Sequence, residues 1–142
     1  MSVIVLTLDQ LFASAMLAAC QKRGLEVAVA QNLDEIPRST QSQCSLLFVD
    51  EKYIDQINSI LPKLNESVSW VLLSHNYSAA EGAMFEFGAV DVVDLETKIN
   101  AEKLLARALR FSSLQQSLIE TTEALNKANA DLELNNDILR HD

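Results

Sequence analysis

The side chains able to do chemistry in this sequence lie mainly at the ends of short apolar runs. Asp9 comes shortly after the run VIVLT, Asp50 ends the run SLLFV, and Ser74 and His75 follow VSWVLL. No acidic or cysteine residue is placed by the sequence to pair with His75 as nucleophile and base, so we expect an exposed loop histidine. The three glycines are too scattered to form a phosphate-binding loop.

The remaining composition excludes several classes of protein. Cys20 and Cys44 lack the spacing of a zinc site or a redox pair, which predicts buried free thiols in a reducing compartment. The net charge of −9 disfavours contact with nucleic acid or anionic lipid, because those surfaces are themselves negative. No apolar stretch is long enough to span a membrane, and no secretory signal is visible. We therefore expect a cytoplasmic protein that binds neither nucleic acid nor membrane.

The elements that must position the strand-end residues alternate in type along the chain. Apolar runs of strand length alternate with stretches of helical periodicity, which predicts parallel pairing and a doubly wound α/β sheet with helices on both faces. In such a sheet, the working site lies at the carboxyl ends of the strands. The expected strands cover residues 3–7, 26–30, 45–49, 68–73 and 89–93, and the expected helices cover 11–23, 53–64, 78–87 and a last one from near 100, with 32–40 left ambiguous.

The strand-end residues also carry a family resemblance. LLFVD ends on Asp50, Ser74 follows the fourth run, and AMFEFGAVDVVD reads as a helix, a Gly-Ala turn and a fifth strand. In this order, residues 1–112 resemble a response-regulator receiver (CheY-like) domain of bacterial two-component systems. The resemblance implies a flavodoxin-like sheet of order 2-1-3-4-5. It also implies that Asp50 is the phosphoacceptor, that Ser74 contacts the phosphoryl group, and that Mg²⁺ assists.

The sequence departs from the family at the residues that neutralise phosphoryl charge. Thr7 and Leu8 stand where the family has an acidic metal-binding pair, and Asp9 comes one position late. Leu95 occupies the position of the family's lysine, and Lys98 lies three residues further on. Two further family features are missing: Val92 replaces the switch aromatic, and Glu51-Lys52-Tyr53 replaces the Met-Pro turn after the phosphoacceptor.

Two interpretations of Asp50 follow. In the first, Asp50 accepts a phosphoryl group, Mg²⁺ is held by Asp9 and Asp50 with help from Glu51, and Ser74 contacts the phosphoryl oxygen. In the second, Asp50 is a residual strand-end aspartate of a degenerate, atypical receiver that signals through partner contacts. The sequence favours the second, because two charge-stabilising elements are missing from chemistry that depends on electrostatics. No cofactor is then expected, and Mg²⁺ only if the site is active.

The C-terminal segment predicts a coiled coil. From Ala101 onwards there is neither Gly nor Pro, and an apolar residue recurs every seven positions. The first turns are expected to complete the receiver-like domain, and residues 113–142 to pair with a second copy in a parallel homodimer. A lone, partly frayed helix is the alternative, because the companion line three residues later is mostly polar. The expected dimer interface is Phe111, Leu114, Leu118, Leu125, Leu132 and Leu139.

The sequence ILRHD at the end of the chain suggests what the helix serves. It resembles the start of a diguanylate cyclase domain and also the phosphoacceptor region of a histidine kinase, which predicts a fragment whose output domain lies beyond Asp142. Three functions remain open: a non-catalytic input and dimerisation module for such an output domain, an active phosphoacceptor, or a structural adaptor. A sensor kinase or another signalling protein is the expected partner.

Overall fold

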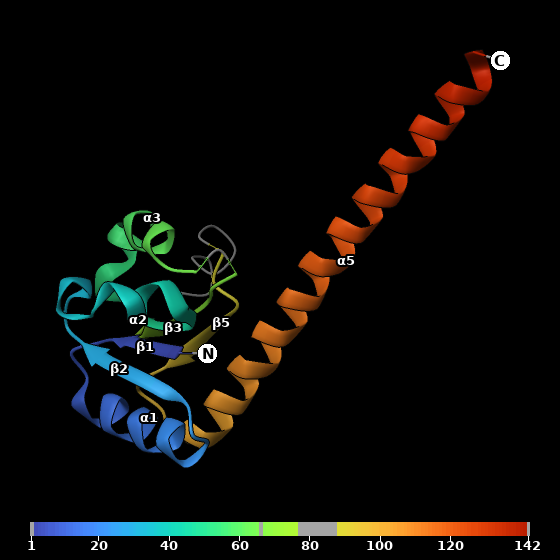
Figure 1. The fold of residues 1–142 in the computed structure, drawn as a ribbon. Helices are drawn as coiled ribbons and strands as arrows, with labels where there is room; N and C mark the ends of the chain where they lie inside the picture. Colours follow the sequence, from blue (N-terminus) through green and yellow to red (C-terminus); the bar gives the residue numbers. More distant parts are fainter. Residues whose placement is uncertain (1, 66, 77–87, 142) are drawn as a thin grey trace. The chain divides into compact units, whose positions relative to one another are not determined.

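The computed structural model describes residues 2–65, 67–76 and 88–141. The chain divides into two compact units, residues 1–112 and residues 113–142. The first unit is an α/β domain built around a parallel sheet, and the second consists of the distal part of one long helix (Figure 1). The predicted helix over residues 78–87 lies entirely outside the described residues.

Five parallel strands form the sheet in the spatial order β2-β1-β3-β4-β5. This is the order that the resemblance implied, so the predicted fold class is confirmed. The central strands are apolar and fully buried because helices cover both faces of the sheet. The strands are β1 (Ser2–Leu6), β2 (Glu26–Ala30), β3 (Cys44–Asp50), β4 (Ser69–Ser74) and β5 (Asp91–Asp94).

The first helix, α1 (Gln10–Lys22), has clear start and stop signals. The Asp9 carboxylate accepts a hydrogen bond from the amide N–H of Phe12 at 3.0 Å and caps the helix. Gly24 follows the helix with a φ of 70°, a left-handed conformation that glycine adopts without a steric penalty. The predicted helix over 11–23 is therefore confirmed within one residue at each end.

Two other segments differ from simple helices. The ambiguous stretch becomes a 3₁₀ turn over Leu33–Glu35, capped by Asn32, followed by the short α2 (Arg38–Gln43). The single helix predicted over 53–64 is wrong in form: a 3₁₀ turn over Glu51–Gln56 precedes α3 (Ile57–Ile60), and another over Leu61–Lys63 follows. Pro62 has no amide N–H to donate, and branched isoleucines favour the helix weakly, so apolar periodicity alone overestimated its regularity.

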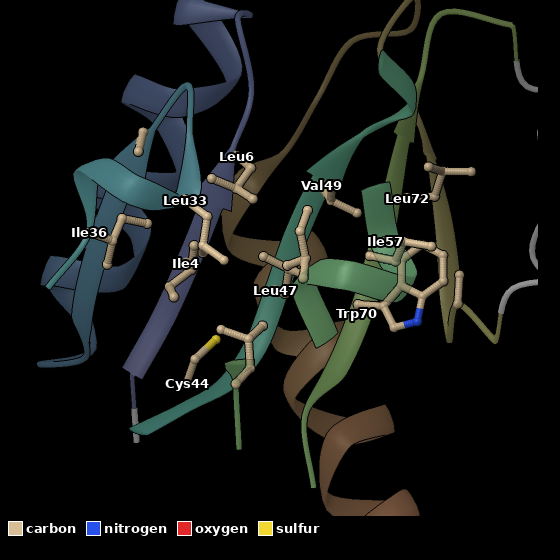
Figure 2. Packing of buried hydrophobic residues seen from close by; sticks show 14 of the residues in the cluster. Ile4, Leu6, Leu33, Ile36, Cys44, Leu47, Val49, Ile57, Trp70 and Leu72 are labelled. Atoms are coloured by element: carbon tan, nitrogen blue, oxygen red, sulfur yellow. The ribbon is translucent and has the colours of Figure 1, made fainter. Parts of the chain in front are cut away.

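The core has one layer on each face of the sheet. On the face covered by α2 and α3, the indole of Trp70 lies beside Ile57 and Leu72, with Leu47 and Val49 from β3 next to them (Figure 2). On the other face, α1 and the first turns of the last helix pack over a second cluster, in which the rings of Phe12 and Phe48 lie 5.8 Å apart. The strands that carry the candidate residues are thus packed on both faces.

The two cysteines belong to these layers. Both are free and buried, as the sequence predicted. Burial raises the pKa of the Cys44 thiol to about 11. Neither thiol is therefore poised to react.

The last helix, α5 (Ala101–His141), contributes to both units. Within the first unit, Leu105 and Ala108 are buried in the core cluster on one face of the sheet. Within the second unit, the leucines at 114, 118, 125 and 132 are each 60% to 67% exposed. Among the described residues, no helix is both long and apolar enough to cross a bilayer.

Candidate functional site

Asp50 lies at the carboxyl end of β3, beside the end of β1. Its side chain is almost completely buried, at 7% exposure. The Thr7 hydroxyl donates a hydrogen bond to Asp50 Oδ2 at 3.2 Å, and the amide N–H of Lys52 donates to Asp50 Oδ1 at 3.1 Å. Both carboxylate oxygens are therefore held by neutral donors. No ion pair joins Asp50 to a lysine or arginine within the described part of the chain.

Thr7 connects the two aspartates of the candidate site. Its buried hydroxyl accepts a hydrogen bond from the amide N–H of Asp9 at 3.0 Å while donating to Asp50. The Asp9 side chain is turned to the start of α1, where it serves as the N-cap. Asp9 and Asp50 still line one surface hollow together with Leu8, Glu51, Lys52 and His75.

Glu51 accepts hydrogen bonds from two residues at the end of β4. The Ser74 hydroxyl donates a hydrogen bond to Glu51 Oε2 at 2.7 Å, and the amide N–H of His75 donates to Glu51 Oε1 at 3.2 Å. The Ser74 oxygen also accepts a hydrogen bond from the amide N–H of Asn76 at 2.9 Å. The hydroxyl proton of Ser74 is thus committed to a carboxylate that fixes the β4 end.

His75 has an acidic partner that sequence reasoning missed. Its Nδ1 lies 2.8 Å from Glu96 Oε1, across the loop after β5, and both side chains are at least half exposed. The hydrogen bond that the His75 ring makes to the Glu96 carboxylate raises the pKa of the imidazole above its ordinary value. Desolvation lowers this pKa, and the negative charges of Glu96, Asp50 and Asp9 raise it further. Pairing with Glu96 therefore favours the charged form of His75.

The positions of the family's lysine and switch aromatic are filled by apolar side chains. Leu95 packs against the core cluster under α5, and its amide N–H donates to the Ser74 carbonyl at 2.8 Å. Lys98 is exposed and lines a different hollow, near Asp94 and Lys103. Val92 is buried in the other core cluster.

The acidic side chains of the hollow do not form a ready metal cage. Across residues 2–65, 67–76 and 88–141, no three histidine, cysteine, aspartate or glutamate side chains are grouped so as to hold a metal ion. Both oxygens of Asp50, both of Glu51 and Oδ1 of Asp9 instead accept hydrogen bonds from hydroxyl and amide donors. Carboxylates from Asp9 and Asp50 are the groups closest in type to those that Mg²⁺ prefers.

Sequence reasoning placed Asp9, Asp50, Glu51 and Ser74 at this edge of the sheet but missed what joins them. Thr7 looked only like a substitution for an acidic residue, although a buried polar residue at a strand end must find a partner. That rule was the available signal for the Thr7–Asp50 hydrogen bond. The sequence carried no comparable signal for the pairing of Glu96 with His75, because this contact depends on how the loop after β5 folds.

Searches by sequence find no relatives: no family model matches the chain, and no curated protein does either. Comparison of the structure with solved structures gives several matches. A response regulator from Thermotoga maritima superposes with a TM-score of 0.63 at 23% identity, covering 79% of this chain and 97% of that one. A CheY-like receiver domain protein from Methanospirillum hungatei gives 0.63 at 13% identity, covering 82% and 96%. The chain has the fold of a response-regulator receiver domain.

Other proteins that share the receiver fold differ in size and description. NtrX from Brucella abortus, solved in complex with ADP, superposes with a TM-score of 0.69 at 18% identity, and the match covers 87% of this chain but only 29% of NtrX. An adenylate cyclase from Rhodopirellula baltica superposes with a TM-score of 0.66 at 12% identity, covering 89% and 96%. At these identities, the likeness concerns the fold alone.

Proposed function

We propose that this chain is a regulatory module of a two-component type signalling protein: a pseudo-receiver joined to a dimerising helix. Its receiver-fold domain relays information through protein contacts, without an aspartyl phosphate. Its long helix pairs two copies and passes the signal to a C-terminal output domain, such as a diguanylate cyclase or a histidine kinase. The chain itself is not an enzyme.

The hydrogen bonding of Asp50 carries this proposal. Phosphoryl transfer to a carboxylate gathers negative charge on the transferred oxygens, and cations must neutralise that charge. The hydrogen-bond donors to Asp50 are a threonine hydroxyl and a backbone amide. Both donors are uncharged, and the unmodified carboxylate already accepts their hydrogen bonds. The position that would supply a lysine instead holds Leu95, packed into the core.

The environment of Glu51 supports the same proposal. A metal-binding role would require Glu51 to leave Ser74 and the amide N–H of His75. A phosphoryl contact by Ser74 would require the same hydrogen bond to break. Both steps in the alternative function therefore begin by opening contacts that hold β4 in place, which favours a fixed scaffold over a reactive centre.

The alternative of an active phosphoacceptor also has one observation in its favour. Asp9 and Asp50 line the same hollow, which is open to solvent. A cation entering the hollow would meet both carboxylates, and Lys52 lies on its rim. We keep Asp50 as the phosphoacceptor candidate, Ser74 as its phosphoryl contact and Mg²⁺ as its cofactor under this second function.

A Mg²⁺ titration separates the two functions. Backbone amide chemical shifts of Thr7, Asp9 and Lys52 report directly on the hollow. The pseudo-receiver predicts no saturable shift up to about 10 mM Mg²⁺, because both oxygens of Asp50 already accept hydrogen bonds. Saturable shifts that disappear in Asp50→Asn and persist in the distant control Asp34→Asn would support the active phosphoacceptor instead.

A further inference from the structure

The exposed face of the second unit is built around a single line of leucines. Leu118, Leu125 and Leu132 recur at seven-residue spacing, and each is at least 60% exposed. Three of the charged residues of this stretch, Glu120, Glu123 and Lys127, lie on the opposite side of a heptad wheel. The fourth, Asp131, lies beside the leucines, where the opposing residue of a parallel second copy is the uncharged Asn136. The leucine face can therefore meet an identical face without repulsion between like charges, which favours a second copy of this chain as its partner.

Two different lines of residues flank the leucines, one on each side. In a first coiled-coil register, the leucines occupy heptad position a, and position d holds Leu114, Thr121, Ala128 and Asn135. In a second register, the leucines occupy position d, and position a holds Gln115, Thr122, Asn129 and Asn136. Moving between the registers turns each helix by about 50° about its own axis.

The two threonines make the registers similar at their centre. The Thr121 hydroxyl donates to the Ser117 carbonyl at 2.8 Å, and the Thr122 hydroxyl donates to the Leu118 carbonyl at 2.9 Å. Each hydroxyl proton is satisfied within its own helix, so either threonine can enter a dry interface without leaving a buried donor unpaired. Either one presents its methyl group to the partner.

The other flanking residues give each register a different source of stability. Asn135 and Asn136 are the same residue type, so they do not distinguish between registers. Leu114 and Ala128 give the first register more apolar surface than Gln115 and Asn129 give the second. The second register places leucine at d and asparagine at a, an arrangement that specifies parallel dimers.

We propose that two copies of this chain pair through α5 in two alternative registers that share the leucine line, and that the signal is a shift between them. The inference rests on the proposed dimerising function and adds the nature of the motion. Rotation of both helices at one end reaches any domain attached beyond Leu139, because a continuous helix transmits rotation along its axis.

Cysteine cross-linking in the full chain tests this proposal. The single variant Thr121→Cys places a thiol at position d of the first register, and Thr122→Cys places one at position a of the second register. The control Glu123→Cys places its thiol on the outer side of the helix in both registers. Two populated registers predict that Thr121→Cys and Thr122→Cys both form disulfide-linked dimers at rates within about tenfold of each other, and that Glu123→Cys is far slower. The unsubstituted chain, with Cys20 and Cys44 buried, sets the background.

Two further substitutions bias the equilibrium in opposite directions. Ala128→Leu adds apolar surface at d of the first register and is expected to raise the ratio of Thr121→Cys to Thr122→Cys cross-linking about tenfold. Asn129→Leu adds it at a of the second register and is expected to lower the same ratio by a similar factor. A ratio unmoved by both substitutions would overturn the two-register proposal.

The result separates failure of the inference from failure of the proposed function. A chain that is dimeric by light scattering, with one threonine position cross-linking no faster than Glu123→Cys, has a single register; the dimer then stands and the register shift is wrong. A monomer with no cross-linking at any of the three positions contradicts the dimerising function itself.

Discussion

The hydroxyl of Thr7 donates a hydrogen bond to the carboxylate of Asp50 across 3.2 Å, at the carboxyl ends of the adjacent strands β1 and β3. The same hydroxyl accepts a hydrogen bond from the amide N–H of Asp9. A position where the resemblance led us to expect a metal-binding acid is thus occupied by a neutral donor. Under the proposed function, that exchange turns a site for binding charge into part of a stable scaffold.

Substitution of Thr7 tests how much this hydrogen bond stabilises the fold. Thr7→Val keeps the side-chain shape but leaves the buried Asp50 carboxylate with one donor fewer, so we expect a loss of about 1–3 kcal/mol in the free energy of unfolding. Urea unfolding followed by the fluorescence of buried Trp70 measures the loss. The matched control Thr7→Ser retains the hydroxyl, and a loss as large as that of Thr7→Val would show that the hydrogen bond is not the cause.

The His75–Glu96 pair predicts a pH-dependent contribution to stability. Because the folded-state pKa of His75 is raised above its ordinary value of 6.5, the pair stabilises the fold below that value, and the contribution is lost as pH rises through the folded-state pKa. Glu96→Gln should therefore lower the imidazole pKa, as measured by NMR titration. The control Glu102→Gln removes a distant carboxylate that pairs with Lys22 and should leave the His75 pKa unchanged.

Leucines in the two parts of α5 should respond differently to truncation. Leu105 is fully buried against the sheet, and Leu105→Ala is expected to cost about 2–5 kcal/mol in the unfolding of the first unit. Leu125 is 60% exposed, so Leu125→Ala should leave the Trp70-detected unfolding transition within about 0.5 kcal/mol of the original. Equal losses at the two sites would contradict the division of the helix into an anchored part and an exposed part.

Self-association should depend on the exposed leucines. Leu125→Asp places a charge in the middle of the leucine face and is expected to convert the dimer into a monomer at tens of micromolar protein, as measured by light scattering. Glu123→Lys also changes a charge nearby but points away from the face, and it should leave the molar mass unchanged. A monomer in the unsubstituted chain would remove the basis of the prediction.

The sequence predicted the sheet well because its signals are local. Apolar runs such as VIVLT and SLLFV can only be buried strands in a chain that alternates with helices, and Gly24 ends a helix by its own conformational freedom. The segment after Asp50 was predicted less well, since 3₁₀ turns flank α3 and Pro62 has no backbone N–H to donate in the second of them. Periodicity reports which side is buried and not how regular the backbone is.

The candidate site was predicted only in part because its contacts link distant residues. Strand topology was sufficient to bring Asp9, Asp50 and Ser74 to one edge of the sheet. The partners that decide their chemistry, Thr7 for Asp50 and Glu51 for Ser74, depend on side-chain directions that a residue pattern does not contain. The apolar role of Leu95 follows the same rule, since its packing under α5 became evident only in the folded chain.

The most direct test of the central claim is incubation of the full chain with a small-molecule phosphodonor and Mg²⁺, followed by intact mass spectrometry. A pseudo-receiver whose Asp50 is held by neutral donors predicts an unchanged mass, identical to that of Asp50→Asn treated in the same way. A stable gain of one phosphoryl group, absent from Asp50→Asn, would contradict the account and assign the chain to active phosphoacceptors.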